Sequence, residues 1–252
     1  MLSSYLARTQ MLLQNPQATT ALYSDADLTL WINIARGQLA GEAECVRVIG
    51  TISTVVDQLP YAFSAINTGV VATNGIEGVI NVGQMWYTVG SGRKWVAPKP
   101  WPWFSLYVYN NPVPQGSEPK QWSQFGQGAA PGSSGAFSGG SFYINQPDIV
   151  YSLELDCICY PAALADDNDP ECIPYQFTDA VPFFAAYYAL LSSQNNARMS
   201  DAEHYYNHYQ TFVERARKQS NPSMNRWMYS QAGDPAQAAK MQVQPRGGAG
   251  GG

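Results

Sequence analysis

Apolar residues near the N-terminus recur at the spacing of two amphipathic helices. The first pattern ends before Pro16 and consists of Leu2, Tyr5, Leu6, Thr9, Leu12 and Leu13. Ser24 then stands where a helix N-cap is expected, with Asp27 three residues later. The stripe that follows runs to about Gly41 and consists of Leu28, Trp31, Ile32, Ala35 and Leu39. Two helices are therefore expected before residue 45.

The pattern changes to the period of β-strands from Cys45 onwards, where apolar residues such as Val46, Val48 and Ile52 alternate with polar ones. Further strand-like segments follow, separated by turn-forming Gly, Pro and Asn: GVINVGQMWYTVG, WFSLYVYN and SFYINQPDIVYSLELDCICY. Several short strands at this spacing predict a β-sandwich or small barrel. Residues 125–141, FGQGAAPGSSGAFSGGS, are too rich in Gly and Ser to pack on themselves. We expect a mobile loop or an arm that a neighbour holds.

Helical spacing returns after Pro174. Thr178 is a candidate N-cap for a helix with Pro182 in its first turn, where proline is tolerated. One face of this helix consists of Val181, Phe184, Ala185, Tyr188 and Leu191. Ser200 and Glu203 have the spacing of a capping box at the start of a last helix. Its apolar stripe consists of Ala202, Tyr205, Tyr206, Tyr209, Phe212, Val213 and Ala216.

The pattern as a whole predicts an α+β protein. We expect the N- and C-terminal helices to form one bundle, with a β domain inserted between them and an extended tail at the end. The predicted parts are residues 1–44 and 173–231 for the bundle, 45–172 for the β domain and 232–252 for the tail. The core of the bundle is expected to contain Trp31, Ile32, Phe184, Tyr188, Tyr205 and Phe212. The tail has few large apolar residues, so we expect something outside its own domain to hold it.

The charge of the chain is low and slightly acidic. Charged residues make up 13% of the 252 residues, and the formal net charge is -5. The sequence has no long run of Lys or Arg and so lacks the electrostatic signature of a protein that grips nucleic acid. No apolar run approaches the roughly 20 residues that span a bilayer, and the first residues lack the features of a secretory signal. We therefore expect no membrane span, a cytoplasmic product and four free thiols.

Residues 156–174, DCICYPAALADDNDPECIP, concentrate cysteine and acidic residues and raise the question of a metal site. In the register of the preceding strand, Cys157 and Cys159 point into the core, and Cys172 supplies neither a CxxC pattern nor a fourth ligand. The acidic run from Asp166 to Glu171 lacks the glycine and the distal glutamate of an EF-hand loop. We expect buried structural thiols, a solvated loop and no metal or cofactor, while adventitious divalent-ion binding at the loop stays open.

The other candidates for chemistry are also incomplete. His204 and His208 lie one helical turn apart, but the chain has no third histidine and no HExxH motif, so we expect a solvated helix face. No GxSxG elbow precedes them, and GSGRK and GQGAAPG do not form a phosphate-binding loop. The segment WVAPKPWPWF, residues 95–104, is a candidate sugar-stacking platform, although packing in the β region or against a neighbouring subunit is favoured. No catalytic residue is predicted.

The order of these signals resembles a known family. Two blocks carry the resemblance: YLARTQMLLQNPQATTALYSDADLTLWINIARGQLAGEAECVR and PDIVYSLELDCICYPAALADDNDPECIPYQFTDAVPFFAAYYALLSSQNN. They are similar to the N-terminal helices and to the strand, acidic loop, Ile-Pro and helix of bacteriophage head-to-tail adaptor proteins, also called connector or head-completion proteins. The large β region between the blocks matches only in outline.

The resemblance implies a structural protein of the virion neck, located between the portal and the tail. It implies a homo-oligomeric ring, usually of twelve subunits, that contacts the portal protein and tail or nozzle proteins. DNA would pass through the lumen without sequence-specific binding. In such proteins the acidic loop and Ile-Pro form a structural joint that needs no metal. A mildly acidic protein suits a DNA conduit, because a lining that repels phosphate lets DNA slide.

We expect the C-terminal residues to dock onto the portal or an adjacent subunit, since aromatic residues and arginine often dominate interfaces. The predicted partner-binding residues are Arg226, Trp227, Met228, Tyr229, Gln231, Met241 and Val243. The other interpretation is that Trp227 closes the bundle. Two alternative functions also stay open: a carbohydrate-binding β module of a tail or secreted protein, and a small hydrolase that uses His204 or His208.

Overall fold

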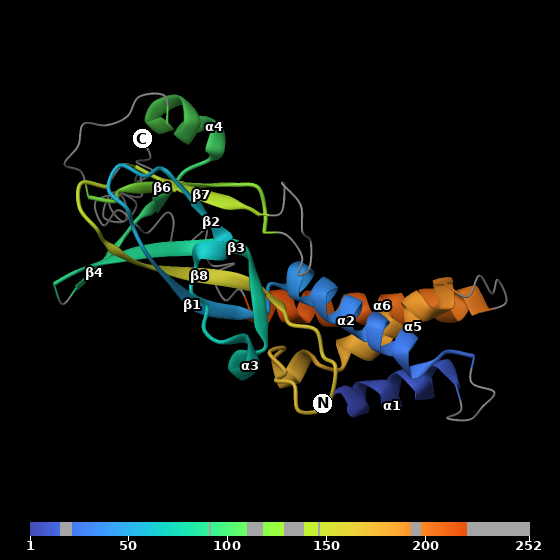
Figure 1. Cartoon of the computed structure of the whole chain (residues 1–252). Helices are drawn as coiled ribbons and strands as arrows, with labels where there is room; N and C mark the ends of the chain where they lie inside the picture. Colours follow the sequence, from blue (N-terminus) through green and yellow to red (C-terminus); the bar gives the residue numbers. More distant parts are fainter. Residues whose placement is uncertain are drawn as a thin grey trace, which may run out of the picture.

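The computed structural model describes residues 1–15, 22–90, 92–109, 118–128, 139–145, 147–192 and 198–220. Long helices gather at one end of the molecule and strands at the other (Figure 1). The long helices are α1 (Leu2–Leu13), α2 (Asp25–Ala43), α5 (Ala180–Ser192) and α6 (Met199–Ser220). The strands are β1 (Arg47–Ser53), β2 (Pro60–Ala62), β3 (Ile76–Val89), β4 (Gly92–Trp95), β5 (Ala97–Pro98), β6 (Gln121–Phe125), β7 (Ser141–Ile144) and β8 (Ser152–Pro161). The predicted α+β class is confirmed.

The strands form two four-stranded sheets. One has the order β1-β8-β3-β4 and the other the order β2-β7-β6-β5. Most neighbours are antiparallel, and β5 and β6 form a short parallel pair. The chain passes from one sheet to the other directly after β4, where the Val96 N–H donates to the Met85 carbonyl oxygen and the Ala97 N–H to that of Lys120. The connection between the sheets at this point is therefore one residue long, and backbone hydrogen bonds hold it to a strand on either side.

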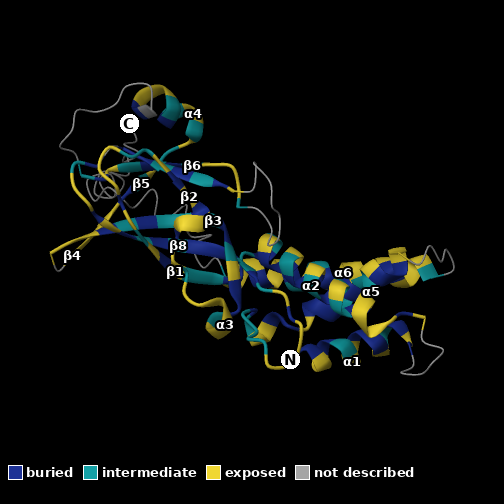
Figure 2. Ribbon diagram, viewed as in Figure 1, coloured by how far each residue is buried: buried dark blue, intermediate teal, exposed yellow. Residues whose placement is uncertain are grey.

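Figure 2 shows that most of β8 is buried, and the buried residues of this strand are apolar. On β8 the alternation is clear: Leu153, Leu155, Cys157 and Cys159 are fully buried, whereas Glu154 and Asp156 keep some exposure. The expected inward orientation of the two cysteines is confirmed. β8 is an inner strand with β1 and β3 as neighbours, so both of its edges are hydrogen-bonded to other strands.

The four long helices pack against one another around α5, which contacts α1, α2 and α6. Helix α2 also contacts β8, and a single cluster of buried side chains runs from the helices into both sheets. Its members include Leu39 of α2, Leu153 of β8 and Phe142 of β7. A second, smaller cluster lies among the helices and contains Leu13, Tyr23 and Leu28.

Most residues expected in the helical core are there. Ile32 and Phe184 are buried, and Trp31, Tyr205 and Phe212 are partly buried and pack against the clusters. Tyr188 was expected in the core, but 40% of its surface is exposed. Its ring stacks on Phe184, and the fully buried residues of α5 are mostly small: Ala180, Val181, Ala185, Ala186 and Ala189. That part of the prediction is wrong because small residues, rather than tyrosine, fill the close helix contacts.

The helix starts agree only in part with the predicted caps. Ser24 is the N-cap of α2, and its side-chain oxygen accepts a hydrogen bond from the Asp27 N–H. Ser200 was expected to cap the last helix, but α6 already begins at Met199, so this prediction is wrong. Thr178 lies before α5, and its hydroxyl donates to the Tyr175 carbonyl oxygen.

The segment WFSLYVYN was expected to be a strand and is helical instead. Residues Trp101–Phe104 form α4, and Ser105–Tyr109 continue it as a short π-helix. Pro102 lies in the first turn, where its fixed φ suits a helix, and the Trp103 and Tyr107 rings are in contact at 5.2 Å. Aromatic side chains four residues apart meet on one face of a helical segment, so strand propensity alone misassigned these residues.

The two described ends of the Gly/Ser-rich segment are packed closely against the β region, and we call them its base. The Gly128 N–H donates to the Ile80 carbonyl oxygen, and the Phe63 N–H to that of Gly140. A Cβ on Gly140 would lie 2.6 Å from the Phe63 ring and 2.7 Å from the Gln127 carbonyl carbon, so only glycine fits there. The arm expected between residues 125 and 141 is described only at these ends.

Candidate functional site

A buried ion pair joins the helices to the segment that returns from the sheets. Arg36 of α2 is fully buried, and its partner Glu171 follows β8 by ten residues. The Arg36 Nε donates to Glu171 Oε2 at 3.1 Å, and Nη2 donates to Oε1 at 3.0 Å. This two-point contact fixes the orientation of both side chains, because the planar guanidinium matches the carboxylate.

The remaining guanidinium nitrogen is also paired. Nη1 of Arg36 donates to the Ala162 carbonyl oxygen at 2.6 Å and to Asn33 Oδ1 at 3.2 Å. Asn33 in turn binds the Leu164 backbone, donating to its oxygen at 3.0 Å and accepting from its N–H at 2.9 Å. Two side chains of α2 thus hold the chain just beyond the end of β8.

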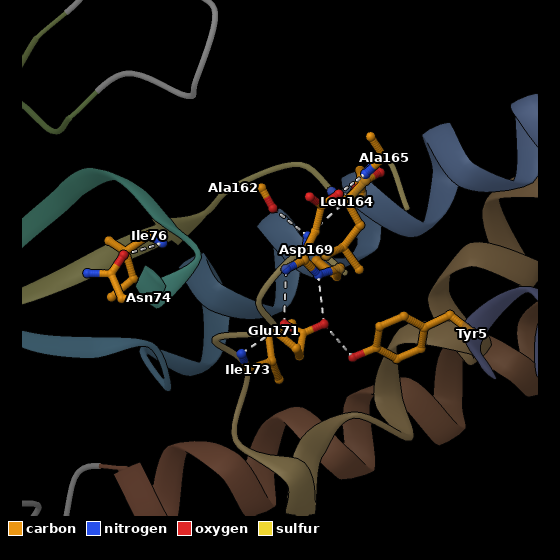
Figure 3. Close-up of polar contacts among 11 residues, drawn as sticks. Tyr5, Asn74, Ile76, Ala162, Leu164, Ala165, Asp169, Glu171 and Ile173 are labelled. Atoms are coloured by element: carbon orange, nitrogen blue, oxygen red, sulfur yellow. Dashed lines mark hydrogen bonds and ion pairs between the residues drawn. The ribbon is translucent and has the colours of Figure 1, made fainter. Parts of the chain in front are cut away.

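Glu171 accepts two further hydrogen bonds, and Figure 3 shows it between Tyr5 and Ile173. The Tyr5 hydroxyl of α1 donates to Oε2 at 2.9 Å, and the Ile173 N–H donates to Oε1 at 2.9 Å. Burial, followed by the negative charge of Glu171 and this hydrogen bond, raises the pKa of Tyr5 far above its usual range. Tyr5 therefore stays a neutral donor, and α1, α2 and the returning segment meet at one carboxylate.

We call this cluster of Tyr5, Asn33, Arg36 and Glu171 the joint. Its ionic groups are compensated on every side, which is the condition under which a buried ion pair is tolerated. Loss of one partner would leave an unpaired buried charge. The joint therefore fixes how the helices sit on the β region.

The acidic loop of the joint is held by its own side chains. Asp169 Oδ2 accepts from the N–H groups of Ala165 at 2.5 Å and Asp166 at 2.9 Å, and Asp166 Oδ1 accepts from the Asn168 N–H at 2.6 Å. These backbone donors, Asp166 first, lower the pKa of Asp169. The carboxylates act here as turn-forming acceptors. Within the described residues, no group of three or more His, Cys, Asp or Glu side chains could hold a metal ion.

The cysteines lie close to the joint but in apolar surroundings. Cys45, Cys157 and Cys159 are buried and Cys172 is half-buried, and all four are free thiols. Burial raises the pKa of Cys157 and of Cys45 to about 12, and that of Cys172 to about 11. Raised pKa values suppress the thiolate form, so these residues pack as small apolar groups.

The histidines and tryptophans are divided between surface and core. His204 and His208 are exposed on α6, as expected for a polar helix face. From the candidate platform, Val96 and Phe104 are fully buried, whereas Trp95 is 57% exposed. The Trp101 ring contacts Tyr143 at 4.6 Å and Phe125 at 4.8 Å. Most of this segment therefore packs within the β region, and Trp95 does not.

The predicted partner-binding residues lie outside the described part of the chain, which ends at Ser220. At the end of the described chain, two arginines form hydrogen bonds that involve α6. The Arg217 Nε donates to the Glu42 carbonyl oxygen at 2.6 Å, and Arg47 Nη1 donates to the Ser220 carbonyl oxygen at 3.1 Å. The end of α6 is thereby tied to the end of α2 and the start of β1.

Sequence reasoning missed the pairing of Arg36 with Glu171. A signal was present, because Arg36 lies on the same helix face as Ile32 and Leu39, which form the apolar stripe of α2. An arginine on a buried stripe needs a carboxylate partner. Glu171 could have been proposed from the acidic loop, but nothing local in the sequence links it to α2.

No helix of the described part is long and apolar enough to cross a membrane. Among models of known protein families, the one described as SU10 adaptor protein matches residues 2–236. No curated protein matches the chain.

Proposed function

This chain belongs to the SU10 adaptor protein family, whose members are phage adaptor-type structural proteins, and we propose that it forms a ring between the portal and the tail. The observation that carries the proposal is the family match, which covers the helices, both sheets and the joint. In this role the ring is a conduit for DNA and a docking platform for tail or nozzle proteins. It consists of roughly twelve copies in closed cyclic symmetry.

The proposed domains correspond to the helical end and the β end of the molecule. In this proposal residues 1–44 and 173–231 form the bundle, residues 45–172 form an inserted β-sandwich or small barrel, and residues 232–252 form the tail. A closed ring requires every subunit to present the same angle between its parts. In this proposal the joint keeps that angle the same in every subunit, because its hydrogen bonds link α1 and α2 to the segment that follows β8.

Helix α2 supports the ring proposal with exposed apolar residues on its outer face. Leu30 is 58% exposed and Ile34 is 37% exposed, one turn apart. Gly37 and Gly41 continue this face, and a Cβ on either would meet no described atom within 4 Å. Glycine has no side chain, so Gly37 and Gly41 leave room for a neighbouring chain to pack beside the exposed Leu30 and Ile34. We assign this face to the contact between neighbouring copies.

The charge of the chain supports the conduit. A formal net charge of -5 in each of many copies makes the ring strongly acidic. Phosphate binding depends on clustered Lys and Arg, so such a ring is expected to repel DNA instead of retaining it. Passage without sequence-specific binding follows from this argument.

The proposed contact with the portal is tested by truncation. Deletion of residues 226–252 removes all seven predicted partner-binding residues and leaves every described residue in place. We expect the truncated chain to fold but to lose its affinity for the portal protein of the same phage, measured by surface plasmon resonance. A full-length Trp227→Ala variant with weakened binding would support the same conclusion. A truncated chain that folds and binds the portal as tightly as the full chain would contradict the proposed docking.

Carbohydrate binding by the β region is the second candidate function. It is favoured by Trp95 and Tyr107, whose side chains are 57% and 56% exposed, since sugars stack on exposed aromatic rings. A glycan array probed with the intact chain distinguishes the two proposals. Binding that disappears in a Trp95→Ala variant would favour the carbohydrate function, whereas the adaptor proposal predicts no glycan binding.

A further inference from the structure

Two imidazole rings on α6 face each other at close range. His204 Nε2 and His208 Nε2 are 3.1 Å apart, and both residues are exposed. Their rings have centroids 4.5 Å apart and are nearly perpendicular. The two nitrogens therefore lie beside each other on one face of the helix, although the rings come from successive turns.

The position of one ring is supported from a neighbouring helix. The Phe183 ring of α5 stacks on His208, with centroids 5.2 Å apart and an angle of 18° between the planes. Phe183 is itself packed against Phe212 of α6, with centroids 5.9 Å apart. This stacking restricts the rotation of the His208 side chain and reduces the entropy lost when its Nε2 binds a ligand.

The separation of the nitrogens fits coordination of one metal ion. Imidazole nitrogens bind late transition metals at about 2.0–2.1 Å, so a 3.1 Å separation corresponds to an N–metal–N angle of roughly 95–100°. Such an angle suits neighbouring positions of a square-planar or octahedral ion. In such a complex the protein would supply two ligands, and water would supply the others.

We propose that His204 and His208 form a two-histidine chelate for a divalent late transition metal, with Cu²⁺ bound most tightly. The order of affinity follows from the general preference of nitrogen ligands for Cu²⁺ over Ni²⁺ and Zn²⁺. In the metal-free pair, the Nε2–H of one ring donates to the Nε2 of the other. On binding, that proton is carried on Nδ1 of the same ring, both Nε2 lone pairs bind the metal, and no net proton is released. The site is independent of the proposed adaptor function.

Two other kinds of metal-binding group in the described chain are less accessible to an ion. The carboxylate of Asp201, three residues before His204, is engaged with Arg198 at 3.2 Å. The thiols of Cys45, Cys157 and Cys159 are buried. The histidine pair is therefore an exposed site with two nitrogen ligands already close together.

The experiment is a calorimetric titration of the full chain with CuCl₂ and, separately, with ZnCl₂. We expect one Cu²⁺ to bind per chain and His208→Ala to lower the affinity on the order of a hundredfold, because the second ligand no longer acts at high effective concentration. The electron paramagnetic resonance spectrum of the Cu²⁺ complex should show two imidazole nitrogens in the wild type. Zn²⁺ should bind at the same site more weakly.

A double variant, His208→Ala with Thr211→His, is the matched control. It keeps two exposed histidines on α6, but residues 204 and 211 lie about 10 Å apart along the helix and cannot share one ion. We expect it to bind Cu²⁺ as weakly as His208→Ala. Equal affinity of the wild type and the double variant would overturn the proposal, as would a wild-type spectrum without a second imidazole nitrogen. Circular dichroism would verify that all variants are folded.

Discussion

Arg36 and Glu171 are 135 residues apart in the chain and form a buried two-point ion pair, with nitrogen to oxygen distances of 3.1 and 3.0 Å. Around them, Tyr5 and Asn33 connect α1 and α2 to the segment that follows β8. The pair links the two blocks of sequence that resemble phage adaptors. Its geometry explains how helices from both ends of the chain are held against the same end of the β region.

Replacement of Arg36 by Met should lower the free energy of unfolding by about 3–5 kcal/mol, because Glu171 would become an unpaired buried charge. Urea denaturation measures this change. The matched control is Arg8→Met, which breaks an ion pair with Asp179 whose side chains are 50% and 55% exposed. That variant should cost about 0–1 kcal/mol. Equal losses in the two variants would show that the joint does not stabilise the fold.

The double variant Arg36→Met with Glu171→Met separates charge from packing. Both ionic groups are then replaced by apolar ones, and we expect a smaller loss than in the Arg36→Met single variant. A loss equal to the sum of the two single variants would mean that the two residues act independently.

Replacement of Gly140 by Ala should destabilise the base of the Gly/Ser-rich segment by about 1–3 kcal/mol, because the added Cβ collides with Phe63 and the Gln127 backbone. Gly139→Ala is the neighbouring control, since a Cβ there would meet no described atom within 4 Å. Thermal unfolding should separate the variants clearly. Equal melting temperatures would contradict the tight base described above.

Stability should fall as the pH rises above 10, in part because of Tyr5. Its pKa is raised in the folded protein, first by burial and then by Glu171, whereas an unfolded tyrosine ionises near pH 10. The folded state thus keeps a proton that the unfolded state loses, and each such group lowers stability by up to about 1.4 kcal/mol per pH unit. Tyr5→Phe should reduce the slope above pH 10. An unchanged slope would show that Tyr5 ionises equally in both states.

The thiols should react with iodoacetamide much more slowly than free cysteine does. At pH 8 the thiolate fraction is small when the pKa is raised to about 11 in Cys172 or about 12 in Cys157. Mass spectrometry should find Cys172, the half-buried residue, modified before Cys157 and Cys159. Rapid modification of Cys157 in the folded protein would contradict the buried orientation of β8.

The sequence was sufficient to predict elements that have a clear period. Helix α2 with its Ser24 cap, the strands β3 and β8, and the apolar stripe of α6 were all expected, because burial of one face imposes a regular spacing. Residues 103–109 are helical instead of the predicted strand, although aromatic and β-branched residues favour strands, because Pro102 in the first turn suits a helix. Tyr188 shows a second limit, because spacing identifies a face but not how far neighbouring helices cover it.

The joint could not be predicted from the sequence in full. An arginine on the buried stripe of α2 indicates that a carboxylate must lie nearby, but several acidic residues of the loop could have served. Only the tertiary structure distinguishes Glu171, which reaches Arg36, from Asp166 and Asp169, which bind their own loop. The histidine pair was visible as a spacing, whereas the close approach of the two nitrogens depends on side-chain torsions that spacing does not determine.

The central claim, that copies of this chain form a ring through the outer face of α2, is tested most directly by electron microscopy. The full chain is imaged alone and mixed with the portal protein of the same phage, beside a Leu30→Ser, Ile34→Ser variant. Both substitutions are at exposed positions, so the variant should remain folded. We predict closed rings with an open channel for the wild type, at least on the portal, and dispersed single subunits for the variant. A wild-type chain that stays monomeric in both conditions, or a variant that forms the same rings, would contradict the account.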